Sequence, residues 1–274
     1  MKEKERRQQK TGKARLTLLD SLRGAALLSM ILYHGTWDLV YMAGVRIPWY
    51  NALPGYLWQQ SICMTFILLS GYCAALAGDP RRLLWRCLIV SVCGILVTAV
   101  TLLVLPEDRV IFGVLTLIGA CMLLVGAVRC VVKHPADPVA GLILSAAAFL
   151  LFRHVNSGCL LLGIFDRGIR IPLPAGLYRG WLMTFLGFPM PGFWSTDYFS
   201  LLPWLAWFLC GYFLRGILKR AGIEEKLQLE VPGLAWMGRH SLPIYLAHQP
   251  VLYLLLMLAG GRDQVEGTLS PCSC

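Results

Sequence analysis

Long runs of apolar residues, separated by short polar or charged breaks, dominate this sequence of 274 residues. A helix of about 20 apolar residues crosses the hydrocarbon core of a bilayer, and most of these runs are long enough to do so. They predict membrane-spanning helices at Leu16–Val40, Leu57–Ala77, Leu83–Leu105, Val110–Val132, Pro138–Phe152, Tyr198–Leu218 and Ser241–Ala259. We therefore expect an all-α, polytopic membrane helix bundle with about seven transmembrane helices.

Two stretches leave the helix count open between six and eight. Residues 138–152 are short for a span, and residues 153–197 have no span-length run but are rich in Pro, Gly and aromatic side chains. Irregular backbone is tolerated at membrane depth where protein surrounds it, so the second stretch has room for a short or re-entrant helix.

Composition supports the membrane class. Hydrophobic residues make up 57% of the chain and charged residues only 15%, and the mean hydropathy is +0.63. A soluble domain has about 25% charged residues. The net charge of +10 does not indicate nucleic-acid binding, because the basic residues are not gathered on a soluble domain. Seven of them precede the first run, which is too long for a signal peptide and is interpreted as a retained anchor.

Loop charges predict the orientation. With the N-terminus inside, inner segments carry seventeen basic residues and outer segments seven, so the positive-inside rule predicts a cytoplasmic N-terminus. We expect a basic cytoplasmic head (1–15), one membrane domain (16–260) and a flexible C-terminal tail (261–274). Cys272 and Cys274 lie in that tail, and the other eight cysteines lie in or beside apolar runs without a CxxC pair. No metal site is predicted.

Four charged or titratable residues, Asp20, Arg23, His34 and Asp38, interrupt the first run. Helical spacing places them on one face, and His34 and Asp38 are an i,i+4 pair. Charges at membrane depth are costly and mark internal, functional faces. Alternatively, the aspartates are interfacial and Arg23 extends to the headgroups, but that leaves His34, deep inside the run, unexplained.

A second polar cluster opens the last run, where Ser241, Tyr245 and His248 share a helical face. Ser241 is a plausible helix start, and Pro250 should kink the helix. Arg239, Ser241, His248 and Gln249 are therefore candidate substrate-binding residues. The alternative is that His248 and Gln249 only form bonds between helices.

Asp197 is a third candidate. It follows an aromatic-rich segment that resembles an interfacial belt. It either binds a polar acceptor on the side of His34 and Asp38 or caps the helix after it.

Motif absences narrow the chemistry. No GxxxxGK[ST] loop, GxSxG elbow or HExxH helix is present, so ATP-driven, lipase-like and zinc-protease activities lack support. A histidine near a carboxylate suits general base or nucleophilic chemistry near neutral pH, and Asp38 is placed to orient His34.

These residues resemble a known family. The chain is similar to the bacterial relatives of the heparan-α-glucosaminide N-acetyltransferase catalytic domain, over roughly residues 15–260. The matching motifs are Leu19-Asp20-Ser21-Leu22-Arg23-Gly24, Tyr33-His34, Trp37-Asp38, Phe66–Gly71, Phe112-Gly113-Val114-Leu115 through Gly119, Asp197-Tyr198, Leu202-Pro203-Trp204, and Gly238-Arg239-His240-Ser241-Leu242 with Tyr245 and His248-Gln249-Pro250.

The resemblance implies a multi-pass enzyme of the bacterial cell membrane. It would take an acyl group, typically acetyl from cytoplasmic acetyl-CoA, and pass it to an acceptor outside. The family's catalytic histidine maps onto His34. Many relatives carry histidine at the position of Thr116, and this departure implies a different acceptor or a weaker enzyme.

The leading hypothesis is transmembrane acyl transfer to a hydroxyl or amine of a sugar or envelope glycan. Catalysis would rest on His34 and Asp38. Donor and substrate binding would rest on Asp20, Arg23, Asp197, Arg239, Ser241, His248 and Gln249, with Arg81 and Arg82 as further inner basic residues for the phosphates of CoA. We expect acyl-CoA as a co-substrate and no nucleic acid as a partner. A homodimer is one of the oligomeric states that the sequence allows. The alternatives are a secondary transporter with an Arg/His/Asp relay and a seven-helix sensor or scaffold.

Overall fold

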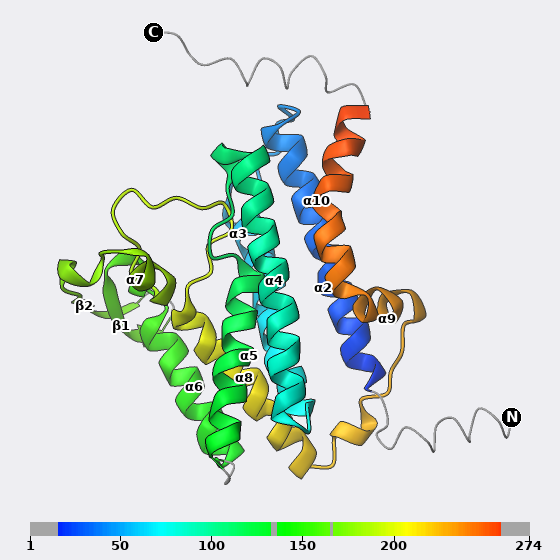
Figure 1. The fold of residues 1–274 in the computed structure, drawn as a ribbon, viewed down its shortest axis with the longest axis vertical. Helices are drawn as coiled ribbons and strands as arrows, with labels where there is room; N and C mark the ends of the chain where they lie inside the picture. The colour runs from blue at the N-terminus through cyan, green and yellow to red at the C-terminus, as the bar shows by residue number, and fades with distance from the viewer. Residues whose placement is uncertain (1–15, 133–135, 165–166, 259–274) are drawn as a thin grey trace, which may run out of the picture. The chain divides into compact units, whose positions relative to one another are not determined.

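The computed structural model describes residues 16–132, 136–164 and 167–258. Most of these residues are helical, and Figure 1 shows long helices with a small two-stranded sheet. The long helices are α2 (Thr17–Tyr41), α3 (Leu53–Leu76), α4 (Pro80–Val104), α5 (Val114–Val131), α6 (Pro138–Phe152), α8 (Leu201–Arg220) and α10 (Ser241–Leu258). The shorter elements are α7 (Trp181–Leu186), α9 (Pro232–Arg239), the 3₁₀ turns η1 (Pro106–Asp108), η2 (Val155–Ser157), η3 (Ala175–Leu177) and η4 (Glu224–Lys226), and the strands β1 (Cys159–Ile164) and β2 (Arg167–Pro172).

The long helices confirm a polytopic helical membrane protein. Six of them (α3, α4, α5, α6 with η2, α8 and α10) are long and apolar enough to cross a bilayer. Helix α2 carries the polar face but, at 25 residues, is also longer than the bilayer core requires. Each long helix falls on one of the seven predicted runs. The stretch 153–197 contains the β1–β2 hairpin and the six-residue α7, and the described part of it has no span-length helix.

Surface composition agrees with a lipid environment. On α4, Ile95 is 66% exposed and Leu103 84% exposed, and α6 likewise exposes Ile143 and Leu144. A water-soluble protein rarely leaves such contiguous apolar faces uncovered. The chain is thus a multi-pass membrane protein.

The described chain packs as two compact units. One comprises the residues up to Phe66 together with those from Gly222 onward, and the other is Ile67–Ala221. The head (1–15) and the tail (261–274) predicted from the sequence lie outside the described residues.

In the first unit, α2 packs along α9 and α10 (Figure 1). Its core includes Leu27, Met30 and Ile62, all almost completely buried. Two glycines allow α2 and α9 to touch backbone to backbone. A Cβ on Gly24 would lie 1.9 Å from the Leu234 carbonyl oxygen, and one on Gly238 would lie 1.8 Å from the Asp20 carbonyl oxygen. Only residues without a side chain fit there.

In the second unit, α4 packs against α5 and α6 packs against α8. Two of these helices start with an aspartate followed by proline. The Asp79 side chain accepts a hydrogen bond from the Arg81 N–H (2.9 Å) at the start of α4. Asp137 accepts from two backbone N–H groups at the start of α6, both at 3.0 Å. This combination of a capping carboxylate with proline at the first helical position fixes both helix starts.

Two arginines of the second unit satisfy carbonyl groups at the C-terminal end of α3. Arg129 of α5 donates to the carbonyl oxygens of Ala74 (3.3 Å) and Gly78 (3.1 Å), and Arg215 of α8 donates to that of Ala75 (2.9 Å). The last carbonyls of a helix have no partners within the helix, and cations are favourable there. Arg129 and Arg215, two of the basic residues that the sequence places on the inner side, thus cap the C-terminal end of α3.

Candidate active site

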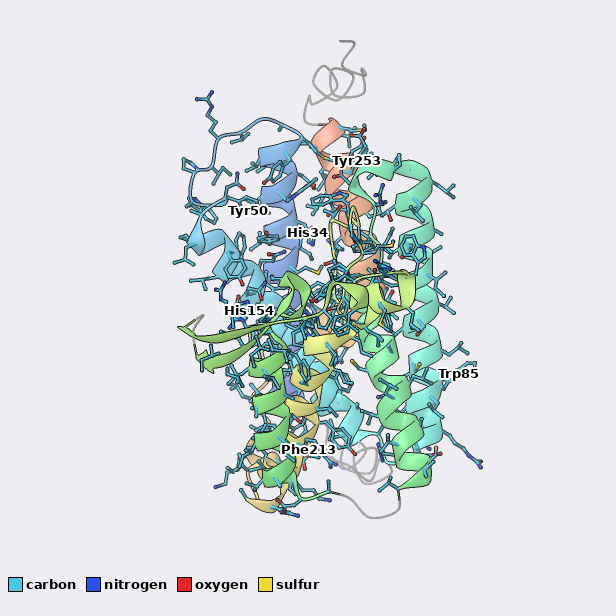
Figure 2. The ribbon with its side chains drawn as sticks, turned by 90° about the vertical axis from the view of Figure 1, so that its left-hand side faces the viewer. His34, Tyr50, Trp85, His154, Phe213 and Tyr253 are labelled. Atoms are coloured by element: carbon cyan, nitrogen blue, oxygen red, sulfur yellow. The ribbon has the colours of Figure 1, made fainter. Side chains whose placement is uncertain are left out.

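Two histidines meet between α2 and α10 in the first unit. The rings of His34 and His248 have centroids 4.9 Å apart, at an interplanar angle of 59°. Tyr33 lies edge-on to His34, and Tyr245 flanks His248. Figure 2 shows His34 on α2, with its side chain among the side chains between α2 and α10. Residues far apart in the sequence therefore form one imidazole pair.

Asp38 lies one turn beyond His34, but its carboxylate contacts α10. The Gln249 side-chain amide donates to Asp38 Oδ1 at 3.0 Å, and Asp38 is only 2% exposed. The structure therefore joins Asp38 with Gln249 and His34 with His248, two pairs at consecutive positions of α10. It shows no hydrogen bond between the described side chains of Asp38 and His34, the contact that the i,i+4 spacing predicts.

Three buried polar atoms in this cluster have no hydrogen-bond partner among the residues that the structure describes: Asp38 Oδ2, His248 Nε2 and Gln249 Oε1. The other nitrogen of His248, Nδ1, contacts the Tyr245 carbonyl oxygen. A carbonyl only accepts, so Nδ1 donates, and in the neutral ring Nε2 then carries the lone pair. All three atoms are acceptors. Buried acceptors are costly without a donor, so the cluster is built to receive N–H or O–H groups.

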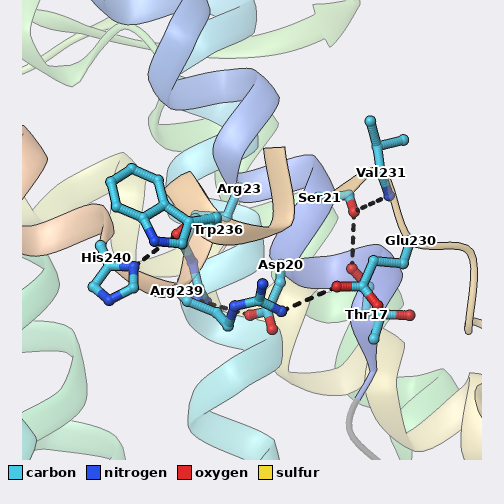
Figure 3. Close-up of polar contacts among 9 residues, drawn as sticks. All are labelled: Thr17, Asp20, Ser21, Arg23, Glu230, Val231, Trp236, Arg239 and His240. Carbon is cyan, nitrogen blue, oxygen red and sulfur yellow. Dashed lines mark hydrogen bonds and ion pairs between the residues drawn. The ribbon is translucent and has the colours of Figure 1, made fainter. Parts of the chain in front are cut away.

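A second cluster surrounds the N-terminal part of α2 (Figure 3). The Ser21 hydroxyl donates to the Thr17 carbonyl oxygen (3.1 Å) and accepts from the Val231 N–H (3.0 Å). This bond, together with the Gly24 and Gly238 contacts, fixes the segment before α9 against α2. The predicted residues Asp20, Arg23 and Arg239 are thereby brought to one place.

Each of the two arginines in this cluster is near a carboxylate. Arg239 Nη1 is 3.1 Å from Glu230 Oε1, and Arg23 Nη1 is 3.9 Å from Asp20 Oδ1. The Arg239 side chain is 30% exposed. A guanidinium carries five N–H donors, so one carboxylate oxygen does not use all of those on Arg239. The cluster thus holds two cations beside α9, and the single contact with Glu230 does not use all the donors of Arg239.

Asp197 belongs to the second unit and caps a helix. Its Oδ2 accepts from the Val114 N–H at 3.3 Å, at the N-terminus of α5. The helix it caps is thus α5, whereas the sequence predicted either an acceptor site or a cap on the helix that follows Asp197. Asp197 lies between α7 and α8, outside the spanning helices, and burial raises the pKa of its carboxyl from 3.8 to about 6.

The segment before α5 is tied to the segment of Asp197 by further bonds. The Ser195 hydroxyl donates to the Ile111 carbonyl and accepts from the Ile111 N–H, both at 2.9 Å. The Phe199 N–H donates to the Phe112 carbonyl at 2.9 Å. Phe112 itself has a positive φ of 57°, which a non-glycine residue rarely adopts. Together with the Asp197 cap on α5, these bonds hold the two segments against each other, so Asp197 has a structural role.

Comparison with protein families identifies the family of this chain. The family model described as "Heparan-alpha-glucosaminide N-acetyltransferase, catalytic" matches residues 15–250. The chain belongs to this family. The matched range contains both polar clusters and ends at Pro250, within α10. Comparison with curated proteins and with solved structures gives no match.

Membership of the N-acetyltransferase family indicates a membrane acetyltransferase-like function. In the first unit, the two clusters contain most of the candidate residues, with Ser241 as the first residue of α10. Among the described residues, no group of three His, Cys, Asp or Glu side chains is arranged to hold a metal ion.

Other positions that the resemblance raised lie in the second unit. Thr116 packs on α4, where its Oγ1 would be 2.9 Å from a Cβ on Gly94. Arg81 and Arg82 are exposed in the first turn of α4.

Two parts of the site, Glu230, which is the partner of Arg239, and helix α9, were not predicted from the sequence. Helix α9 has only eight residues, too few for a search for span-length runs. Its signal was Pro232 at the first helical position.

Proposed function

We propose that this protein is an integral membrane acyltransferase that moves an acyl group, most simply acetyl, from cytoplasmic acyl-CoA to a hydroxyl or amine on the outer face. The acceptor would be a sugar or an envelope glycan, and the membrane a bacterial cell membrane. The observation that carries the proposal is the set of buried acceptor atoms beside His34. An acceptor nucleophile brings the N–H or O–H groups that these atoms require.

The second cluster, with Asp20, Arg23, Glu230 and Arg239, would be the inner cluster and bind the donor. Arg23 and Arg239 would contact the phosphates of CoA, for which guanidinium groups are well suited. Asp20 and Glu230 would hold the two side chains in place before the donor arrives. The helical rise from Asp20 to His34 amounts to about 21 Å. The acyl end of a long donor would therefore extend along α2 toward the histidine pair.

The first cluster, with His34, Asp38, His248 and Gln249, would be the outer cluster and carry out the transfer. The attacking hydroxyl or amine would donate its proton to His34, and neighbouring O–H or N–H groups of the acceptor would donate to Asp38 Oδ2 and His248 Nε2, with Gln249 holding Asp38 in place. The attacking oxygen or nitrogen would bond to the acyl carbon and the C–S bond would break. His34 would take the acceptor proton and pass it to the departing thiolate, which leaves as free CoA thiol. In the covalent variant, His34 attacks the acyl carbon, the C–S bond breaks and the thiolate leaves with the ring proton. The acceptor then attacks the acyl-histidine, and its proton returns to the ring. Ser241 would help to hold the donor.

Thiol release from acetyl-CoA by the purified protein, with amino sugars or neutral sugars as acceptors, tests this proposal. We expect acceptor-dependent release that falls by about two or more orders of magnitude in His34→Gln, the range that loss of a general base gives. His154→Gln, outside both clusters, is the matched control. Wild-type turnover in His34→Gln would refute the assignment. Acid-quenched enzyme that retains labelled acetyl only with His34 present would select the covalent variant.

A transporter would also use a polar face on a spanning helix. The family match gives it no support. CoA-independent uptake of a solute into proteoliposomes would favour it over the transferase.

A further inference from the structure

The β1–β2 hairpin of the second unit has one continuous apolar face. In the antiparallel register, Leu160 is opposite Ile171 and Leu162 is opposite Ile169. These two pairs are two residues apart along each strand, so their side chains share one face of the sheet. We call these four residues the hairpin face. Leu162 is 53% exposed, Ile169 70% and Ile171 41%.

The opposite face of the hairpin is the one that packs on the protein. Leu161 on that face is 4% exposed, and β1 contacts α6. The hairpin face therefore points away from the elements that support the hairpin. Large branched side chains that are exposed together on a small sheet form a site of association. We therefore expect another molecule to cover the hairpin face.

Chain connectivity places the hairpin at a membrane surface. The candidate span that contains α6 and η2 ends at Ser157, and β1 begins at Cys159. Only Gly158 lies between them. Figure 1 shows the hairpin at the end of α6, close to α7. Trp181 and Leu182 at the start of α7 are 57% and 69% exposed, as expected of an aromatic belt at the interface.

The charges around the hairpin match lipid phosphates. Arg153 at the end of α6, Arg170 on β2 and Arg179 before α7 are all exposed. In the sequence from 153 to 196, four arginines are accompanied by a single carboxylate residue, Asp166. An apolar face bordered by cations is the pattern of a segment that lies in the interfacial layer of a bilayer.

We propose that the hairpin face lies in the interfacial layer of the bilayer that α6 crosses, with Arg153, Arg170 and Arg179 near the phospholipid phosphates. The hairpin would be a monotopic anchor added to the spanning helices. It would hold the segment from β1 to α7 close to the membrane surface. This inference does not rest on acyl transfer.

Two quenchers test the placement in proteoliposomes of the full chain. An environment-sensitive fluorescent amino acid is introduced by amber suppression at Ile169, on the hairpin face, or at Arg170, the adjacent residue of the opposite face. At Ile169 we expect strong quenching by brominated phosphatidylcholine and little by aqueous iodide. At Arg170 we expect weaker quenching by the brominated lipid. A probe at Leu162, opposite Ile169, should repeat the Ile169 result.

Two outcomes would overturn the proposal. If iodide quenches the Ile169 and Leu162 probes as strongly as the Arg170 probe, the face is in water. If both quenchers fail at Ile169 and Leu162, and lowering the protein-to-lipid ratio restores quenching, a second copy of the chain covers the face instead. Thermal unfolding of each labelled protein confirms that it is folded.

Discussion

The substitution Gly238→Ala tests whether direct contact between α2 and α9 builds the donor end of the site. The added Cβ would lie 1.8 Å from the Asp20 carbonyl oxygen and 2.7 Å from its carbon. Both are backbone atoms of a helix, so no side chain can rotate out of the way. Reaching an ordinary contact of 3.4 Å requires the two helices to separate by about 1.6 Å.

That separation has a predictable cost. Overpacking of a tight contact costs about 1–3 kcal/mol. For a chain of this size, about 2 kcal/mol lowers the unfolding midpoint by roughly 4–8 °C. Arg239 follows Gly238 directly and would move with α9, and the 3.0 Å bond between the Val231 N–H and Ser21 would lengthen. We therefore expect stabilisation by acetyl-CoA to be lost as well.

Gly233→Ala is the matched control. Gly233 belongs to the same helix, and a Cβ there meets nothing within 4 Å. Because alanine favours helix by up to about 1 kcal/mol over glycine, this variant should be as stable as the wild type or more stable. Thermal unfolding in detergent, with and without acetyl-CoA, compares the pair. Equal midpoints and equal acetyl-CoA shifts in the two variants would refute both the contact and its role in donor binding.

Further predictions concern the other polar contacts. Gln249→Leu removes the donor to the buried Asp38 carboxylate, so unfolding stability should fall by about 1–3 kcal/mol and turnover should fall with it; midpoints and turnover equal to wild type would contradict this. Burial raises the pKa of Asp197 to about 6 in the folded protein, from 3.8. The folded state therefore binds the proton more tightly, and stability should decline as pH rises from about 4 to about 6. Asp197→Asn keeps an acceptor for the Val114 N–H and should flatten that decline in thermal midpoints; an unchanged slope would assign it to another group.

The spanning helices could be predicted from the sequence because each contains an apolar run long enough to cross a bilayer. Ser241 was expected to start the last helix, and α10 does begin there. The β1–β2 hairpin and α9 were not predicted, because six-residue strands and an eight-residue helix are too short for a pattern that measures runs against a bilayer. Their positions depend on tertiary contacts, such as the buried Leu161 and the close approach at Gly238.

The candidate residues of the site were visible in the sequence, but their pairing was not. Helical spacing linked Asp38 to His34 within α2, whereas the structure pairs Asp38 with Gln249. Periodicity describes one helix at a time and contains no information on which face of α10 meets α2. The same limit hid the role of Asp197, whose hydrogen-bond partner Val114 is 83 residues away.

The most direct test of the central claim follows an acetyl group across a sealed membrane. Proteoliposomes containing the protein and loaded with an amino sugar receive acetyl-labelled acetyl-CoA outside, with vesicles of inward-facing and outward-facing protein separated by protease accessibility of the N-terminal head. The account predicts acetylated sugar inside the vesicles, with free CoA thiol released outside, and neither product with His34→Gln. Labelled sugar that forms only after the vesicles are broken, or loss of unmodified sugar from them without thiol release, would contradict it.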